Sequence, residues 1–318
     1  MTKTIIVRHE RPEWTRDYVE RLTPMFPGMA FKPAYTLDEA MALAPAAEAI
    51  MGIGPQLPPA LFAATTRLEW VQTLTTGIDN FLHMKELPEG VPVTNIVGVQ
   101  GPQMSEATMA LMLALARDLP GVLRAQAEAR WDRRMQIALH GKTLCLLGLG
   151  SIAETLTVYA RTFGMRVIGV SDGRREAPGV ERIYPRAALA EAAGEADFLV
   201  VLVPLTPETR HIVDARVLAA MKPGGFLLNM ARGGCVDPAA LIEALEAGRI
   251  AGAALDVFER TPLPPDDPLW TAPNLIISPH VGGYADIYAD QCLPTVIENL
   301  KIYAEQGPGG LRSVLPAR

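Results

Sequence analysis

The sequence predicts an α/β fold with two domains, the larger of which is an open, doubly wound parallel sheet. The chain has 318 residues, which is more than a single hydrophobic core usually supports. Between residues 142 and 280, short apolar runs alternate with helical patterns, an order typical of parallel sheets. These runs show no alternation of apolar and polar residues, as expected of strands that helices cover on both faces.

Each strand of the larger domain is expected at one of these apolar runs. The runs are Thr143–Leu149, Arg166–Val170, Phe198–Val203, Phe226–Met230, Ala253–Phe258 and Leu275–Ser278. The segments between them are long enough for the helices that connect parallel strands.

A smaller, flavodoxin-like α/β domain is expected in the first hundred residues. Its patterns predict strands at Thr4–Arg8, Ala49–Ile53, Leu68–Leu74 and Pro92–Ile96, and helices at Glu10–Leu22 and Leu37–Leu43. A long helix is expected at Pro102–Arg117, and a last helix, near Ile287–Glu305, is expected to return to the first domain. We therefore expect one domain from residues 1–99 and 286–318, and the other from residues 100–285.

The composition argues against partners such as nucleic acid or a membrane, and against a metal site. The net charge is −6, the sequence pI is near 5.5, and no basic stripe is present. No apolar stretch approaches the ~18 residues of a membrane span. Cys145, Cys235 and Cys292 lie far apart, without the spacing of disulfides or zinc ligands. The apolar part of the N-terminus is too short for a signal peptide, so we expect a cytoplasmic protein.

A glycine-containing turn follows the first strand of the larger domain. Gly148 permits a sharp turn, Gly150 permits a phosphate to approach the backbone, and Ala153 permits close helix packing. The free N–H groups and the dipole at the start of the next helix favour an anion there. The pattern therefore predicts a pyrophosphate-binding turn, although by itself it also fits an ordinary tight turn.

Polar residues follow other strands of the same predicted sheet, where ligands of open α/β sheets bind. Arg232 offers a planar fork for a carboxylate, and His280 is a proton donor or acceptor near neutral pH. Taken singly, the arginine fits a surface ion pair and the histidine fits an ordinary loop residue. Their shared edge with the glycine turn suggests hydride transfer between a dinucleotide and a small 2-oxo acid.

Several motifs in order resemble the D-2-hydroxyacid dehydrogenase family over nearly the whole chain. They are Leu74–Asn80, Asn95–Val97 with Ser105–Ala107, Gly148–Ala153, Pro204–Thr209, Asn229–Gly233, Leu255–Phe258 and Ser278–Gly283. The tract Pro262–Trp270 is most similar to the shorter glyoxylate/hydroxypyruvate reductases of that family.

The resemblance implies a role for each motif. Backbone N–H groups of Thr76, Gly77 and Ile78 would hold the substrate carboxylate, Arg232 would bind the carboxylate and carbonyl oxygens, and His280 would protonate the carbonyl oxygen. Asp256 would face the nicotinamide side. The cofactor-binding residues would be Gly148, Gly150, Ser151, Ile152, Ser171, Arg174, Arg175, Val203, Pro204, Met230, Ala231, Arg232, Asp256, His280, Gly282 and Gly283.

The resemblance also implies larger-scale behaviour. Residues 1–99 and 286–318 would be the substrate domain and residues 100–285 the dinucleotide-binding domain, with hinges near Gly98–Pro102 and Gly282–Asp286. A homodimer would form through the nucleotide domain, with an arm near Arg124–Met135. The product would be a D-2-hydroxy acid, formed from glyoxylate, hydroxypyruvate or another small 2-oxo acid.

One position departs from the family pattern. The family has a glutamate before the proline of the Pro262 tract, paired with the histidine, and this chain has Thr261 there. Glu259 is a candidate substitute only if the loop is shifted. The loss of this carboxylate leaves two alternatives to a reductase, which are a catalytically weak nucleotide-sensing homologue and a formate-type dehydrogenase.

The segment after the second strand favours NADP over NAD, although NAD stays possible. Ser171 stands where an acid would bind the adenosine ribose, and Arg174 and Arg175 would attract a 2′-phosphate. Asp172 is the counter-argument, and its turn position suggests that it points to solvent.

Overall fold

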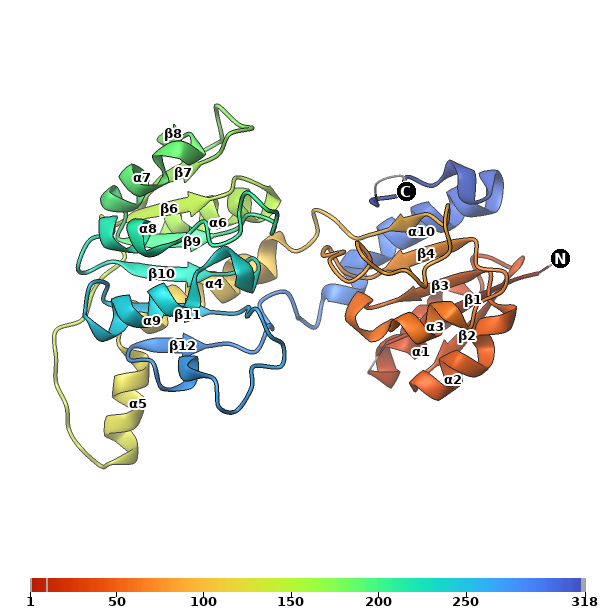
Figure 1. Ribbon diagram of the computed structural model, residues 1–318, viewed down its shortest axis with the longest axis horizontal. Coiled ribbons are helices and arrows are strands. Elements are labelled where there is room, and N and C mark those ends of the chain that lie inside the picture. Colours follow the sequence, from red (N-terminus) through yellow and green to blue (C-terminus); the bar gives the residue numbers. More distant parts are fainter. Residues whose placement is uncertain (1, 10, 316–318) are drawn as a thin grey trace. The chain divides into compact units, whose positions relative to one another are not determined.

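The computed structural model describes residues 2–9 and 11–315 and divides into two compact units (Figure 1). Unit 1 comprises Met1–Val99 and Asp286–Arg318, and unit 2 comprises Gln100–Ala285. In the described part of the chain, no helix combines the length and apolar character needed to cross a membrane. The same part holds no cluster of three or more His, Cys, Asp or Glu residues suited to a metal ion.

Unit 1 is built on a parallel sheet with the strand order β2-β1-β3-β4-β5. Its strands are β1 (Lys3–Arg8), β2 (Met29–Ala34), β3 (Ala49–Gly52), β4 (Trp70–Thr73) and β5 (Val93–Thr94). Its helices are α1 (Pro12–Leu22), α2 (Leu37–Leu43), α3 (Pro59–Ala63) and α10 (Tyr288–Gln306).

The two faces of this sheet carry separate cores. Side chains alternate along a strand, so Ile5 and Val7 of β1 pack with α1 and α10, whereas Ile6 packs with α2 and α3. Because helices cover both faces, functional side chains of unit 1 are left to the ends of its strands.

Unit 2 is built on a larger parallel sheet with the order β12-β11-β10-β9-β6-β7-β8. Its strands are β6 (Thr143–Leu147), β7 (Arg166–Val170), β8 (Arg182–Tyr184), β9 (Phe198–Val201), β10 (Phe226–Asn229), β11 (Gly252–Leu255) and β12 (Leu275–Ile277). Its helices are α4 (Gly101–Ala116), α5 (Leu119–Ala127), α6 (Ser151–Thr162), α7 (Leu189–Glu195), α8 (Ala215–Ala220) and α9 (Pro238–Glu246). Side chains of α7, α8 and α9 pack on one face, and side chains of α4 and α6 on the other.

The predicted fold class is confirmed, with corrections at the strand ends and sheet edges. The predicted strands that include Val203 and Val257 extend beyond the observed ends of β9 and β11. The side chains of Val203 and Val257 are buried in the core, which makes them part of an apolar run, but their backbones do not pair in the sheet. The strands β2 and β8 were not predicted. Both are edge strands: β2 contains Lys32 and Pro33, and β8 has only three residues and begins with Arg182, so neither forms a clear apolar run. Helix α1 begins at Pro12, and Glu10 lies outside the described residues.

Candidate active site

The carboxyl edge of the unit 2 sheet gathers the predicted site residues in one row. All strands are parallel, so their carboxyl ends share an edge. From one end of the row to the other, the residues that follow the strands are His280 (β12), Asp256 (β11), Arg232 (β10), Pro204 (β9), Gly148 (β6) and Ser171 (β7). The order reverses at β6, and ligands of open α/β sheets bind at such a point.

The glycine turn after β6 has the backbone that a phosphate site requires. Gly148 has φ 103°, and a Cβ there would lie 3.0 Å from the backbone of Leu202, so only glycine fits. Around Gly150, no atom lies within 4 Å of the place of a Cβ, so its backbone is open to approach. Ser151 and Ile152 begin α6, and Ala153 is buried against the sheet. The first N–H groups of α6 therefore suit a pyrophosphate.

The loop after β7 is held by its own side chains. The hydroxyl of Ser171 accepts hydrogen bonds from the backbone N–H of Gly173 and of Arg174, at 3.2 and 3.1 Å. Asp172 is exposed, in line with the expectation that it points to solvent, but it also has a partner that was not predicted. Its carboxylate accepts a hydrogen bond from the backbone N–H of Arg186 at 2.8 Å and pairs with the Arg186 guanidinium at 3.3 Å. Asp172 is thereby partly neutralised by a cation that the sequence did not link to it.

Arg174 has an unpredicted acidic partner. Its Nη1 pairs with Oε1 of Glu154 at 2.5 Å, and both side chains are partly exposed. Glu154 lies in the first turn of α6, immediately after the glycine turn. The acidic charge of Glu154 beside the glycine turn was the signal in the sequence for a basic partner. That partner, Arg174, comes from the loop after β7, which the sequence alone could not place next to α6.

Arg232 ends β10 beside a very close backbone contact. Its Nη1 donates to the carbonyl of Ala231 at 2.7 Å, and Asn229 donates to the carbonyl of Arg232 at 2.9 Å. A Cβ on Gly233 would lie 1.9 Å from the backbone carbon of Phe258, so glycine is required there. This contact holds the loop that carries Thr261 against the end of β10.

Glu259 does not take the place of the absent carboxylate. Its Oε1 lies 2.9 Å from Nη2 of Arg210 and 2.9 Å from Nε2 of His211. The side chain is thus committed to another histidine, and the shifted-loop alternative has no support in this arrangement. Thr261 itself is exposed.

His280 sits in a turn that Asp256 holds together. His280 has φ 57°, a left-handed conformation that is costly for a residue other than glycine, and its N–H donates to the carbonyl of Ser278 at 2.9 Å. Asp256 is 1% exposed. One of its oxygens accepts from the Ser278 hydroxyl at 2.6 Å and from the Val281 N–H at 3.0 Å. The other accepts from the Gly282 N–H at 2.9 Å.

The hydrogen bonds of Asp256 are therefore with this turn, and its expected place on the nicotinamide side stays a prediction. These bonds offset the strained backbone of His280 and fix the direction from which its ring leaves the sheet edge. Sequence reasoning missed the role of Ser278, although its place between β12 and the histidine was the available signal.

The remaining predicted cofactor residues also lie at this edge. Val203 is buried and Pro204 is exposed, and the carbonyl of Pro204 accepts a hydrogen bond from the Thr209 hydroxyl at 2.6 Å. A Cβ on Gly282 would lie 2.8 Å from the Asp256 carboxylate, and one on Gly283 would lie 2.9 Å from Gln100. Gly282 is therefore needed for close packing on the buried Asp256, whereas a Cβ on Gly283 would meet the flexible end of the Gln100 side chain.

The predicted carboxylate-binding loop belongs to unit 1, after β4. The carbonyl of Thr76 accepts a hydrogen bond from Asn95 at 2.8 Å, and the carbonyl of Gly77 accepts one from the Thr75 hydroxyl at 2.9 Å. In a trans peptide the N–H points away from the C=O. The N–H groups of Gly77 and Ile78 therefore point away from these partners, as an anion-binding loop requires.

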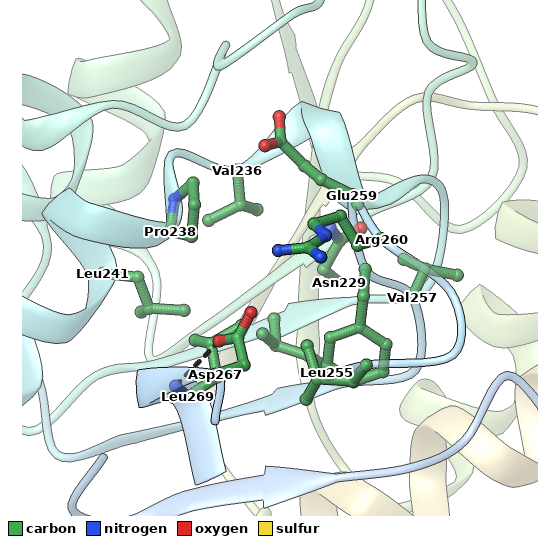
Figure 2. A pocket seen from close by; sticks show the side chains of 13 residues that line it. Asn229, Val236, Pro238, Leu241, Leu255, Val257, Glu259, Arg260, Asp267 and Leu269 are labelled. Atoms are coloured by element: carbon green, nitrogen blue, oxygen red, sulfur yellow. Dashed lines mark hydrogen bonds between the residues drawn. The ribbon is translucent and has the colours of Figure 1, made fainter. Parts of the chain in front are cut away.

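Unit 2 also contains a small cavity of about 80 Å³ below the loop that follows β11 (Figure 2). Figure 2 shows Arg260 directed into this cavity and Glu259 directed away from it. The volume is far below the roughly 300 Å³ of a typical small-molecule pocket. The row of strand ends, rather than this cavity, is therefore the candidate active site. The lining residues are Asn229, Gly233, Val236, Pro238, Leu241, Leu255, Val257, Phe258, Glu259, Arg260, Leu263, Asp267 and Leu269.

Comparison with known families and proteins agrees with this geometry. Residues 109–282 match the model of the D-isomer specific 2-hydroxyacid dehydrogenase NAD binding domain. The chain is 34% identical over 246 residues to a glyoxylate reductase of Korarchaeum cryptofilum, a match that covers 76% of this chain and 74% of that one. It is 37% identical over 241 residues to a D-3-phosphoglycerate dehydrogenase of Methanocaldococcus jannaschii. That match covers 74% of this chain but only 45% of the larger relative.

A solved structure shares the whole fold. It is an NADPH-dependent glyoxylate/hydroxypyruvate reductase from Sinorhizobium meliloti in complex with NADP and sulfate. The TM-score is 0.80 at 28% identity, and the match covers 99% of this chain and 97% of that one.

Proposed function

Because this chain belongs to the family of D-isomer specific 2-hydroxyacid dehydrogenases, we propose that it reduces a small 2-oxo acid, such as glyoxylate or hydroxypyruvate, to the D-2-hydroxy acid with NADPH. The observation that carries the proposal is the placement of Arg232, Asp256 and His280 on three adjacent strand ends, in one row with the Gly148 turn. That row offers a carboxylate-binding cation and a proton donor beside a dinucleotide site.

Each group has a task in the proposed reduction. Arg232 binds the substrate carboxylate and carbonyl oxygen and stabilises the negative charge that grows on that oxygen. NADPH, when bound, supplies the hydride that reaches C2 of the 2-oxo acid. His280 donates its proton to the oxygen, so that a hydroxyl forms. The N–H groups of Gly77 and Ile78 are carboxylate-binding groups of unit 1, and in unit 2 Asp256 positions His280 through the turn.

Replacing Arg232 with Lys tests the anchor. An ammonium cannot reproduce the two-pronged grip of a guanidinium, so we expect kcat/KM on the best 2-oxo acid to fall by about 100-fold, equivalent to ~3 kcal/mol. Steady-state kinetics measure this, with Arg216→Lys on α8 as the matched control. Near-normal turnover by Arg232→Lys would remove Arg232 from the mechanism.

The cofactor preference rests on the loop after β7. Arg175 and Arg174 supply positive charge beside Ser171, although Arg174 shares its charge with Glu154, and Asp172 is paired with Arg186; together these charges favour a 2′-phosphate at this place. We expect higher kcat/KM with NADPH than with NADH, and a loss of that preference in Arg174→Ala/Arg175→Ala. A wild-type preference for NADH, or an NADPH rate that ignores both substitutions, contradicts the assignment.

A catalytically weak nucleotide-sensing protein is the second candidate. Thr261 favours it, because Glu259 is bound to Arg210 and His211 and supplies no carboxylate to His280. Tight NADPH binding without measurable oxidation of NADPH by any 2-oxo acid would support this alternative. A formate-type dehydrogenase is disfavoured, because such enzymes have an amide at the position of Thr261.

The proposed assembly is a homodimer through α5 and the segment that follows it. Leu123 is 54% exposed, and Trp131 and Met135 are each 96% exposed, which leaves an apolar surface on this arm. Figure 1 shows α5 and this segment extending away from the unit 2 sheet. Light scattering on a sizing column should report twice the chain mass, and Trp131→Glu should yield monomer. The three cysteines are buried and form no disulfide, which is compatible with the proposed cytoplasmic location that cell fractionation tests.

A further inference from the structure

The carboxyl end of β1 leaves two successive residues with an unpaired buried nitrogen. Nη1 of Arg8 and Nε2 of His9 are among the buried side-chain atoms of the described residues that lack a hydrogen-bond partner. A buried donor without a partner costs about 1–3 kcal/mol, and more if it is charged. Proteins retain such a cost mainly at functional sites, where the unsatisfied group serves in binding or catalysis.

Of the two residues, Arg8 carries the charge. Burial lowers the pKa of His9 to about 4, so its ring is neutral at pH 7. Burial also lowers the pKa of Arg8 from its ordinary value, which is so high that the guanidinium stays protonated. The end of β1 therefore presents one half-buried positive charge.

No carboxylate in the described part of unit 1 forms an ion pair with Arg8. Its Nε donates to the carbonyl of Gln56 at 3.0 Å, which fixes the guanidinium beside the loop after β3. The charge of Glu39 raises the pKa of Arg8 through a longer-range electrostatic interaction, without an ion pair. The Glu39 carboxylate accepts hydrogen bonds from the N–H groups of Tyr35 and Thr36, at 2.6 and 3.1 Å, and so caps α2.

Arg8 shares a sheet edge with the proposed carboxylate-binding loop. The strand β3 lies between β1 and β4, so Arg8 and the loop after β4 are two strand spacings apart, about 10 Å. Asn80, in the segment after β4, donates to the carbonyl of Gly54 in the loop after β3 at 2.8 Å and so joins these two loops. Both anchor points thus belong to one unit and one edge.

We propose that Arg8 binds a second anionic group of the substrate, so that the preferred substrates are 2-oxo acids with a distal carboxylate or phosphate. The inference rests on the proposed function, in which Gly77 and Ile78 bind the first carboxylate. A guanidinium binds either anion through two parallel hydrogen bonds. The distal anion completes the hydrogen bonding of Arg8, whereas glyoxylate is too short to reach it.

Matched substrate pairs test the proposal. The pairs are 2-oxoglutarate with 2-oxopentanoate and 3-phosphohydroxypyruvate with hydroxypyruvate, and the variant is Arg8→Met. In the wild type we expect kcat/KM to be about tenfold or more higher for the charged member of at least one pair, mainly through KM. The pair that shows the preference identifies a carboxylate or a phosphate.

The variants separate the charge of Arg8 from general effects. Arg8→Met should abolish the preference and leave glyoxylate kinetics within about twofold, while Arg8→Lys should keep part of it. Lys32→Met, which removes an exposed charge on β2, should change neither. If Arg8→Met unfolds, Arg8→Lys and the loss of the wild-type preference at high salt carry the test.

The outcomes distinguish this inference from the proposed function. Turnover of glyoxylate without any preference for charged substrates, or equal losses on both members of a pair in Arg8→Met, overturns the role of Arg8 alone. If no 2-oxo acid is reduced, the proposed function fails. In that case, binding titrations with 2-oxoglutarate and 2-oxopentanoate test the inference: tighter binding of 2-oxoglutarate supports the role of Arg8, and equal binding overturns it.

Discussion

Buried polar groups at the carboxyl edges of the two sheets differ in their hydrogen bonding. In unit 2, both oxygens of Asp256 are used by Ser278, Val281 and Gly282, so this carboxylate needs no ligand. In unit 1, Nη1 of Arg8 at the end of β1 and Nε2 of His9, which follows it, have no hydrogen-bond partner. The carboxylate proposed to position the proton donor is therefore held by the protein itself, whereas the guanidinium proposed for substrate selection leaves a hydrogen bond for the substrate to supply.

Asp256→Asn is expected to have the largest effect, because it removes part of the hydrogen bonding that Asp256 makes within unit 2. An amide supplies one acceptor where the carboxylate supplies two, so an N–H group of the His280 turn loses its partner. We expect the free energy of unfolding to fall by about 2–3 kcal/mol and kcat to fall by about 100-fold with little change in KM.

Urea titration and steady-state kinetics measure these changes. The control is Asp237→Asn, because Asp237 caps α9 through its side chain and Asn is an equally good cap. Equal losses of kcat and of substrate affinity in Asp256→Asn would show that the turn does not position His280 specifically.

Acid should destabilise unit 1 through His9, whose buried Nε2 has no hydrogen-bond partner. The pKa of His9 is about 4 in the folded chain and near 6.5 when unfolded, so the unfolded chain binds more protons between these values. Stability is then lost as the pH falls through this window. From pH 7 to pH 5 we expect a loss of about 2 kcal/mol from this residue. Unfolding in urea at both pH values should show a smaller loss in His9→Asn, and an identical loss in the variant rules out His9 as its source.

Thr261→Glu should have the smallest effect and would add a carboxylate to the loop after β11, on the side of the comparison that holds His280. A carboxylate before Pro262 would stabilise the protonated form of His280, so the pH optimum of 2-oxo acid reduction should rise and the rate should increase a few-fold. Thr261→Gln, of the same size but uncharged, should leave the pH optimum where it is. A pH profile that is the same in all three proteins would show that another group governs the acid.

The sequence was sufficient for the features that depend on short stretches of chain. The strand-end placement of Arg232 and His280 was predicted because each lies shortly after an apolar run, and family resemblance, now confirmed, added Asp256. Partners that come from distant segments were not predicted. The bonds from Asp172 to Arg186 and from Glu259 to Arg210 depend on which loops meet, and no local pattern records that.

The two-part construction of unit 1 has a consequence for synthesis. Unit 2 is one continuous stretch, whereas unit 1 takes α10 from the other end of the chain. Cys292, Val296, Leu300 and Tyr303 of α10 fill the core on one face of the unit 1 sheet. As the chain leaves the ribosome, α1 is the only one of the two helices on that face while the whole of unit 2 is made, and domains generally fold as units once their residues have emerged. The second unit in sequence order is thus the first that can complete its fold, and a nascent chain stalled before α10 exposes the part of the apolar sheet face that α10 covers to chaperones.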